Sequence, residues 1–339
     1  MNAIRATRVA AEASPGLTGL VAWFVLAFSH AASPPLVPAQ GGPADSAAAP
    51  RPPRITMVAV GDINLARRLG ERMHAANDYS LPFRSIAPVL ADADIAFGNL
   101  EAALCPRPPY PLTGFSLRAR PRAVEALVGA GLDVVSVANN HFGDCGAEGI
   151  RFGVERLRAR GVRTAGAGLD FDEAHAAAII ERQGVRFAFL AYSYAARGDV
   201  PRTHGAVIAG LDTAQLRRDV AAARAAADVV LVSVHDGIEY ARQPTAATQR
   251  FARAAIDAGA LVVLGHHPHV PQPVESYNDG WIFYSLGNFV FEQFDPGTRT
   301  GLMARLTFLG AKLEKAEAVP IVIETFARPR LAASEDGSR

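Results

Sequence analysis

From about residue 55 onward, short apolar runs rich in β-branched residues alternate with stretches whose apolar positions are three and four apart. The first pattern is typical of buried strands and the second of helices that pack one face against a sheet. Strands are therefore expected at 55–60, 94–97, 132–138, 162–165, 177–181, 185–192, 229–234, 261–264, 274–277, 281–284, 302–309 and 313–325. Helices are expected at 65–76, 82–91, 121–129, 147–160, 213–227 and 245–258.

The order of these elements predicts the fold class. Strands and helices alternate up to residue 264, and strands alone follow. This order predicts an α/β fold in which two mixed β-sheets are packed between helices, an αββα sandwich. No internal repeat or change of composition divides the region, so we expect one domain over residues 54–327.

Both ends of the chain differ from this domain. Arg5 and Arg8 precede the apolar run 17–28, and small residues follow it, as in a secretory signal. Segment 1–31 is therefore expected to be a signal peptide or, if uncleaved, a membrane anchor, although the run is shorter than the roughly 20 residues of a typical span. Residues 32–53 form a Pro/Ala-rich linker expected to be disordered, and 328–339 a disordered tail. The protein is expected to be exported, either to the periplasm or outside the cell, and to be free or membrane-anchored.

Composition narrows the function classes. A chain of 339 residues with 50% hydrophobic and 20% charged content is globular, and its net charge of +1 offers no electrostatic attraction for nucleic acid, which we exclude as a partner. Two cysteines, Cys105 and Cys145, each follow a predicted strand end on one rim of the sheet. In an oxidising compartment they either pair as a disulfide or remain two unrelated thiols.

A cluster of histidines indicates metal chemistry. His266, His267 and His269 occur within four residues at the end of an apolar run, and His141 and His235 also follow such runs. Neutral imidazole is a common metal ligand, and His267 and His269, two apart on an extended segment, should point the same way. One such histidine is usually structural, but five in three strand-end blocks favour a metal site.

Carboxylates and amides accompany these histidines at the carboxyl ends of the predicted strands, where open α/β sheets place their ligand sites. The polar blocks lie at 61–64, 98–101, 139–141, 235–240, 265–269 and 284–289. A mixed set of oxygen and nitrogen donors suits zinc, manganese or iron rather than calcium. We therefore expect one or two divalent ions as cofactor.

Six short motifs stand at the predicted strand ends: GD at 61–62, NLE at 99–101, ANNHxxDxG at 138–146, HxGxEY at 235–240, GHHPHVxQ at 265–272 and YSLGNFVF at 284–291. Together they resemble the motifs of the CapA proteins of bacterial capsule and poly-γ-glutamate synthesis, whose fold resembles the calcineurin-like metallophosphoesterases. The resemblance covers about residues 55–325 and keeps the family's order.

The resemblance implies roles for individual residues. The implied metal ligands are Asp62, Glu101, Asn140, His235, His267 and His269, with His266 as an alternative in its block. His141 resembles the histidine that protonates the leaving group, and Glu239 is expected to assist catalysis by orienting ligands or substrate. The residues expected to support the ligands or contact substrate are Asn64, Asn99, Asp144, Asp236, His266 and Asn288.

Two positions depart from the pattern. Phosphoesterases of the wider fold have Asp-x-His in the first block, whereas the third residue here is Asn64, so a strong ligand is missing from the first metal site. Asp236 stands where the family has tryptophan, and it either adds a ligand or changes the contacts with substrate.

These features predict a metal-dependent hydrolase connected with capsule or poly-γ-glutamate synthesis. Its substrate would be a phosphoester or an amide or γ-glutamyl bond, and its partners an anionic polymer and the membrane-bound capsule synthesis machinery. An alternative is a non-catalytic accessory protein that binds a nascent acidic polymer. A further alternative is a metal-dependent peptide epimerase, since a metal held against a peptide carbonyl acidifies the adjacent Cα–H.

Overall fold

A computed structural model of the protein describes residues 51–197, 205–293, 295–325 and 327–332. The expected signal or anchor at 1–31, most of the linker and the end of the tail lie outside these residues. In the part of the chain that is described, no helix is both long enough and apolar enough to cross a membrane.

The larger sheet has eight strands in the order β18-β17-β16-β1-β2-β5-β6, and β15 pairs with the end of β1. Strands β1, β2, β5, β6 and β15 are parallel where they pair, whereas β16, β17 and β18 are antiparallel. The strands are β1 (Arg54–Ile63), β2 (Ile95–Leu100), β5 (Val134–Ser136), β6 (Arg163–Ala165), β15 (Asn288–Val290), β16 (Thr300–Leu309), β17 (Lys312–Glu324) and β18 (Arg328–Leu331).

The smaller sheet has six strands in the order β13-β14-β12-β11-β9-β8. Its four central strands run parallel, and both edge strands are antiparallel to their neighbours. The strands are β8 (Ala178–Arg182), β9 (Val185–Ser193), β11 (Val229–His235), β12 (Val262–His266), β13 (Val274–Tyr277) and β14 (Gly280–Phe283). Two short pairs stand apart: β3 (Ala103–Leu104) with β4 (Arg118–Ala119), and β7 (Ala167–Gly168) with β10 (Val207–Ile208).

Aromatic side chains hold the two sheets together. Phe97 of β2 stacks on Phe189 of β9 with ring centroids 5.6 Å apart, and Phe187 meets Phe308 of β16 edge-on at 5.1 Å. All four rings are buried, and such pairs combine a large buried apolar area with specific geometry. This shared core fixes the two sheets face to face.

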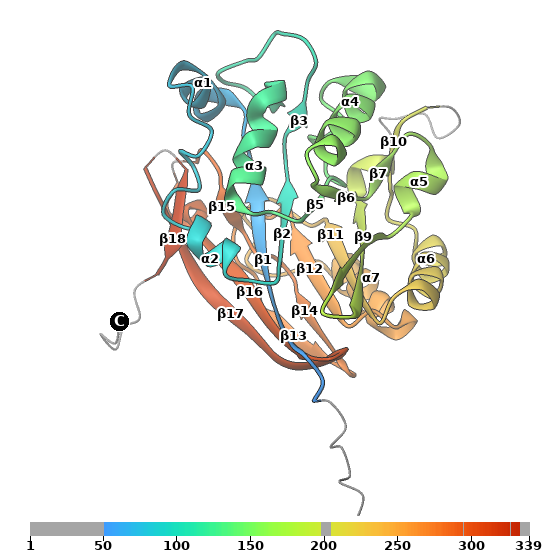
Figure 1. The fold of residues 1–339 in the computed structure, drawn as a ribbon. Coiled ribbons are helices and arrows are strands. Elements are labelled where there is room, and N and C mark those ends of the chain that lie inside the picture. The colour runs from blue at the N-terminus through green and yellow to red at the C-terminus, as the bar shows by residue number, and fades with distance from the viewer. Residues whose placement is uncertain (1–50, 198–204, 294, 326, 333–339) are drawn as a thin grey trace, which may run out of the picture. The chain divides into compact units, whose positions relative to one another are not determined.

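Helices cover the outer faces (Figure 1). Helix α6 packs on β9 and β11, and α7 on β12 and β14. In α6, Leu216, Val220 and Ala223 form the buried stripe, and Asp212 caps the first turn by accepting the N–H of Ala214 at 2.8 Å. The helices are α1 (Arg67–Ala75), α2 (Ala87–Ala91), α3 (Val124–Ala130), α4 (Gly146–Ala159), α5 (Phe171–His175), α6 (Thr213–Ala226) and α7 (Ala246–Ala258). The expected αββα sandwich is confirmed.

Two sequence predictions are wrong in detail. The expected tail begins with an ordered strand, because 328–331 pair with the edge of the larger sheet as β18 and bury Pro329. The expected helix at 82–91 is shortened to α2, since residues 80–86 form successive turns such as Phe83 N–H to Ser80 C=O at 3.1 Å.

Candidate metal centre

The carboxyl ends of strands from both sheets meet at one edge and bring the predicted ligands together. Asp62 at the end of β1 pairs in register with Asn99 of β2 and Asn288 of β15, and His235 of β11 pairs with His266 of β12. Glu101 continues this edge, since its N–H donates to the carbonyl of Ile63 at 2.9 Å. The polar groups therefore converge because parallel strands end at the same rim.

Two glycines allow this convergence. A Cβ at Gly61 would lie 1.9 Å from the carbonyl oxygen of Gly287, and one at Gly265 would lie 2.0 Å from that of Tyr284. Only glycine permits the backbone to approach so closely. The residue that follows each glycine, Asp62 or His266, is thereby set at the edge.

The first group of potential ligands comprises Asp62, Glu101 and His269. Nδ1 of His269 is 3.3 Å from Oδ2 of Asp62, and its Nε2 is 3.7 Å from Oε1 of Glu101. Asn288 fixes the ring, because its Oδ1 is 2.9 Å from the same Nδ1.

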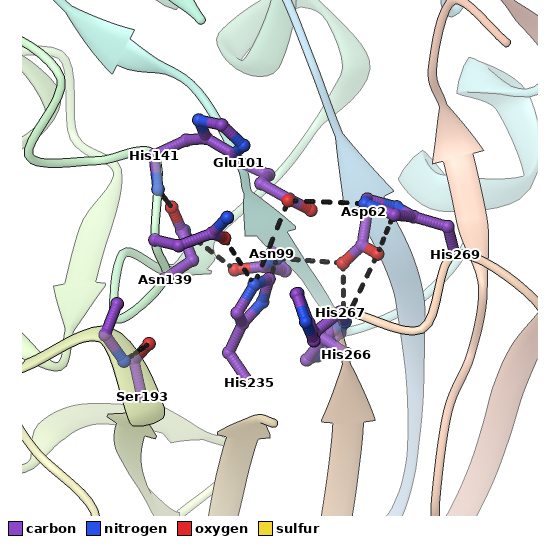
Figure 2. Close-up of polar contacts among 12 residues, drawn as sticks. Asp62, Asn99, Glu101, Asn139, His141, Ser193, His235, His266, His267 and His269 are labelled. Atoms are coloured by element: carbon purple, nitrogen blue, oxygen red, sulfur yellow. Dashed lines mark hydrogen bonds and ion pairs between the residues drawn. The ribbon is translucent and has the colours of Figure 1, made fainter. Parts of the chain in front are cut away.

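The second group comprises Glu101, His235 and His267. Nε2 of His235 is 3.8 Å from Oε1 of Glu101 and 2.8 Å from Oδ1 of Asn140. In Figure 2, Glu101 lies between His235 on one side and Asp62 with His269 on the other. Each group places its donor atoms within 4.8 Å of one another, as donors to one ion must be.

Glu101 belongs to both groups, and its nearest basic neighbour in the first group is the ring of His269, 3.7 Å from Oε1. The side chain is fully buried, and neither carboxylate oxygen has a hydrogen-bond partner among the described residues. Burial, followed by the negative charge of Asp62, raises the pKa of Glu101 well above its ordinary value. Its surroundings therefore disfavour the ionised form, which a bound divalent cation would stabilise, so the residues present fit a divalent metal.

The pKa values of the other titratable groups in the cluster shift in different directions. Burial lowers the pKa of His235 and of His267, which keeps both imidazoles neutral and able to ligate. Burial opposes ionisation of Asp62, but hydrogen bonds from His266 and His269 outweigh it and hold the pKa of Asp62 well below normal. Burial also disfavours charge on His269, yet Glu101 and Asp62 raise its pKa to about 9.

A chain of amides supports the ligands. Asn99 donates from Nδ2 to Oδ1 of Asp62 at 2.8 Å, and Asn139 donates to Oδ1 of Asn99 at 3.1 Å. Oδ1 of Asn139 in turn accepts the backbone N–H of His141 at 3.1 Å. Asn139 was not among the residues singled out from the sequence, although its place in the Asn-Asn-His block was a usable signal.

His141 and Asp144 form a pair beside the cluster, with Nδ1 of His141 3.1 Å from Oδ2 of Asp144. The same carboxylate accepts the N–H of Leu117, from the segment that joins β3 to β4. A disulfide between Cys105 and Cys145, with Cα atoms 5.9 Å apart, ties that segment to the residue after Asp144. Of the two alternatives for the cysteines, the structure therefore has the disulfide.

The triple-histidine block differs from its expected geometry. His266 is still in β12, whereas His267 and His269 have φ angles of 98° and 58°, so the segment is a left-handed turn and not extended. The prediction of an extended segment was wrong, because tertiary contacts override the strand pattern here. His266 is fully buried, its Nδ1 lies 3.3 Å from Oδ1 of Asp62, and it belongs to neither of the two groups described above.

The remaining candidates lie around the rim. Glu239 is on an exposed loop, close enough for its charge to contribute, after burial and Asp62, to the raised pKa of Glu101. Asp236 accepts the hydroxyl of Thr248 on α7 at 2.8 Å. Asn64 is buried, and its Oδ1 accepts the N–H of Ala66 at 2.9 Å. The structure thus assigns Asp236 a partner on α7 and Asn64 a turn-forming contact.

Comparison with known proteins shows which family the chain resembles. Residues 56–293 match the family model described as "Bacterial capsule synthesis protein PGA_cap". The "Capsule biosynthesis protein CapA" of Bacillus anthracis is 33% identical over 250 residues, which cover 71% of this chain and 60% of that protein. The "PGA biosynthesis protein CapA" of Bacillus subtilis (strain 168) is 29% identical over 268 residues, covering 78% and 70%.

Two further similarities are relevant. A protein of Mycobacterium tuberculosis named "Probable polyglutamine synthesis accessory protein" is 30% identical over 277 residues, covering 74% of this chain and 70% of that one. A hypothetical protein from Thermus thermophilus shares the fold, with a TM-score of 0.50, 18% identity and coverage of 78% of this chain and 98% of that chain.

Proposed function

Because the chain belongs to the family of bacterial capsule synthesis proteins, we propose that it is an exported, metal-dependent hydrolase connected with capsule or poly-γ-glutamate synthesis. Its substrate is a phosphoester or an amide or γ-glutamyl bond in an anionic polymer. Export is proposed from the basic and apolar pattern of residues 1–31, and the disulfide accords with an oxidising compartment.

The shared position of Glu101 carries this proposal. One buried carboxylate without a hydrogen-bond partner among the described residues takes part in two ligand groups, which between them contain Asp62 and three histidines. Glu101 would thus be a ligand in either group, and the residues of the two groups could hold one or two divalent ions. A bound divalent cation would polarise the attacked bond and lower the pKa of water from about 16 toward 7.

Side chains of this protein would supply the proton for the leaving group and hold the ligands in their orientation. Asp144 accepts from Nδ1 of His141, which fixes the ring and leaves Nε2 to face the departing group. In its doubly protonated form, with the Nδ1 proton held by Asp144, His141 is then the general acid that transfers its Nε2 proton to the leaving group. Asn99 and Asn139 hold the carboxylate of Asp62 in place, and Glu239 adds negative charge at the exposed rim.

Hydrolysis assays on the full chain test the proposal. Activity toward p-nitrophenyl phosphoesters and γ-glutamyl peptides is measured after chelation and after readdition of Mn²⁺, Zn²⁺ or Fe²⁺. We expect metal-dependent cleavage of one substrate class, and a large loss of turnover in His141→Gln without loss of metal. A metal-replete protein that is inert toward both classes would refute the hydrolase.

A second candidate function is a non-catalytic accessory protein that binds a nascent acidic polymer. Asn64 favours it, since an amide occupies the position where the wider fold has a histidine ligand. The name of the Mycobacterium tuberculosis relative also points to an accessory role. Binding of poly-γ-glutamate by the metal-replete chain without turnover would identify this function.

A further inference from the structure

Asn64 presents a buried donor that has no acceptor. Its Oδ1 accepts the N–H of Ala66 at 2.9 Å, and this bond fixes which side-chain atom is oxygen and which is nitrogen. The side chain is 1% exposed, and Nδ2 has no hydrogen-bond partner in the described structure. A buried amide in this state destabilises the fold unless some ligand accepts from it.

Arg67 presents a second such donor three residues later. Its Nε is buried and likewise has no hydrogen-bond partner in residues 51–197, 205–293, 295–325 and 327–332. The backbone of Arg67 has a φ of 55°, a conformation that a non-glycine residue adopts at a cost in energy. Strain of this kind often accompanies binding sites.

Both donors lie beside the first ligand group. Asn64 directly follows β1, two residues after Asp62, and its backbone N–H donates to the carbonyl of Val290 in β15 at 2.7 Å, which keeps it at the same edge of the sheet. Burial raises the pKa values of Tyr240 and Glu292, and the positive charge of Arg67 opposes both shifts. The Tyr240 ring is 6.3 Å from that of His269.

We propose that segment 64–67 is an oxyanion-binding subsite next to Asp62, Glu101 and His269, with Nδ2 of Asn64 and the guanidinium of Arg67 as its donors. It holds a carboxylate or phosphate group of the substrate, and in this respect it rests on the proposed function. These donors select for an anion, because Nδ2 of Asn64 and the guanidinium of Arg67 can donate hydrogen bonds but cannot accept them. The planar guanidinium also matches the geometry of a carboxylate or phosphate. The subsite also explains Asn64: the residue presents a hydrogen-bond donor to substrate in place of a histidine ligand for metal.

Calorimetric titration of the full, metal-loaded chain tests the subsite. The probes are a short γ-glutamyl oligomer and inorganic phosphate at low salt, and the metal content of every variant is matched. Arg67→Gln should weaken binding of the recognised probe by about tenfold to a hundredfold. Asn64→Asp, which keeps the oxygen that accepts from Ala66, should weaken it to a similar degree.

The matched control is Arg68→Gln, which removes the same charge from the exposed neighbouring residue and should change affinity by less than about twofold. The probe that responds to Arg67→Gln identifies the group as carboxylate or phosphate. Equal affinities of wild type and Arg67→Gln for both probes, or no binding of either probe by wild type, would overturn the inference. Turnover is measured separately, so an inert protein whose binding depends on Arg67 refutes the hydrolase and retains the subsite.

Discussion

Replacing Glu101 with glutamine should have opposite effects on the metal-free and the metal-bound protein. The substitution keeps the size of a fully buried side chain and removes its charge. In the metal-free protein both carboxylate oxygens lack hydrogen-bond partners among the described residues, and burial raises the pKa of the group. Because folding disfavours the ionised form that the unfolded chain adopts at pH 7, a glutamine that cannot ionise should stabilise the metal-free fold at pH 7 on the order of 1–3 kcal/mol, or about 2–4 °C per kcal/mol.

In the metal-bound protein the same change removes a ligand shared by two groups. Loss of one partner from a buried ionic interaction costs about 3–5 kcal/mol, which weakens metal affinity at least about a hundredfold. At a free metal concentration of about 100 times the wild-type Kd, metal stabilises the wild type by about 2.7 kcal/mol. The variant should gain at most about 0.4 kcal/mol under the same conditions.

Thermal unfolding after chelation, and after titration with Mn²⁺ or Zn²⁺, measures both effects. Asp219→Asn is the matched control, because Asp219 is also buried but accepts the Tyr192 hydroxyl at 2.8 Å and lies outside both ligand groups. This control variant should be less stable than the wild type without metal, and metal should raise its free energy of unfolding as much as it does for the wild type. If Glu101→Gln behaves like this control, the reasoning about Glu101 is refuted.

Four further predictions concern other parts of the site. Because folding raises the pKa of His269 from an ordinary 6.5 to about 9, protonation of this residue should stabilise the metal-free fold fully below pH 6.5, and the stabilisation should be lost as pH rises toward 9. Unfolding of the chelated protein across that pH range checks this, and metal affinity should rise over the same range as the ring loses its proton. Asp144→Asn should lower turnover about 10- to 100-fold with metal content unchanged, since Asp144 orients His141; equal loss of metal would contradict it. Cys145→Ser should lower the free energy of unfolding by about 4 kcal/mol, a value that follows from the 40-residue separation of the two cysteines. Denaturant titration under oxidising conditions measures it, and an unchanged midpoint would disprove it. Asn64→His should raise metal affinity about tenfold or more, because it adds an imidazole two residues from Asp62. Isothermal titration measures the affinity, and an unchanged value would show that the new ring does not reach the metal.

Most of the architecture was predictable because its signals are local. Apolar runs that end in polar blocks located β1, β11 and β12, and the helical spacing of Leu216 and Val220 located α6. Strand β18 was missed because Pro329 and the basic residues around it do not read as a strand, and only pairing with the edge of β17 orders them. An edge strand of this kind depends on tertiary hydrogen bonds that the local pattern does not contain.

The candidate site was predictable in its members but not in its arrangement. Strand ends on one rim bring Asp62, Glu101 and His235 together, as expected from topology. The left-handed turns at His267 and His269 depend on the surrounding packing, and so does the contact of Asp236 with Thr248. The sharing of Glu101 between two ligand groups is likewise a three-dimensional property, since no spacing in the sequence encodes it.

Elemental analysis of the full chain and of Glu101→Gln, purified in parallel without added chelator, tests the central claim most directly. We predict at least one divalent manganese, zinc or iron ion per wild-type chain and loss of most of it in the variant, with both proteins folded. A folded wild-type protein that neither carries such an ion nor takes one up when it is supplied, or equal metal in the two proteins, would contradict the proposal that Glu101 joins two metal-ligand groups.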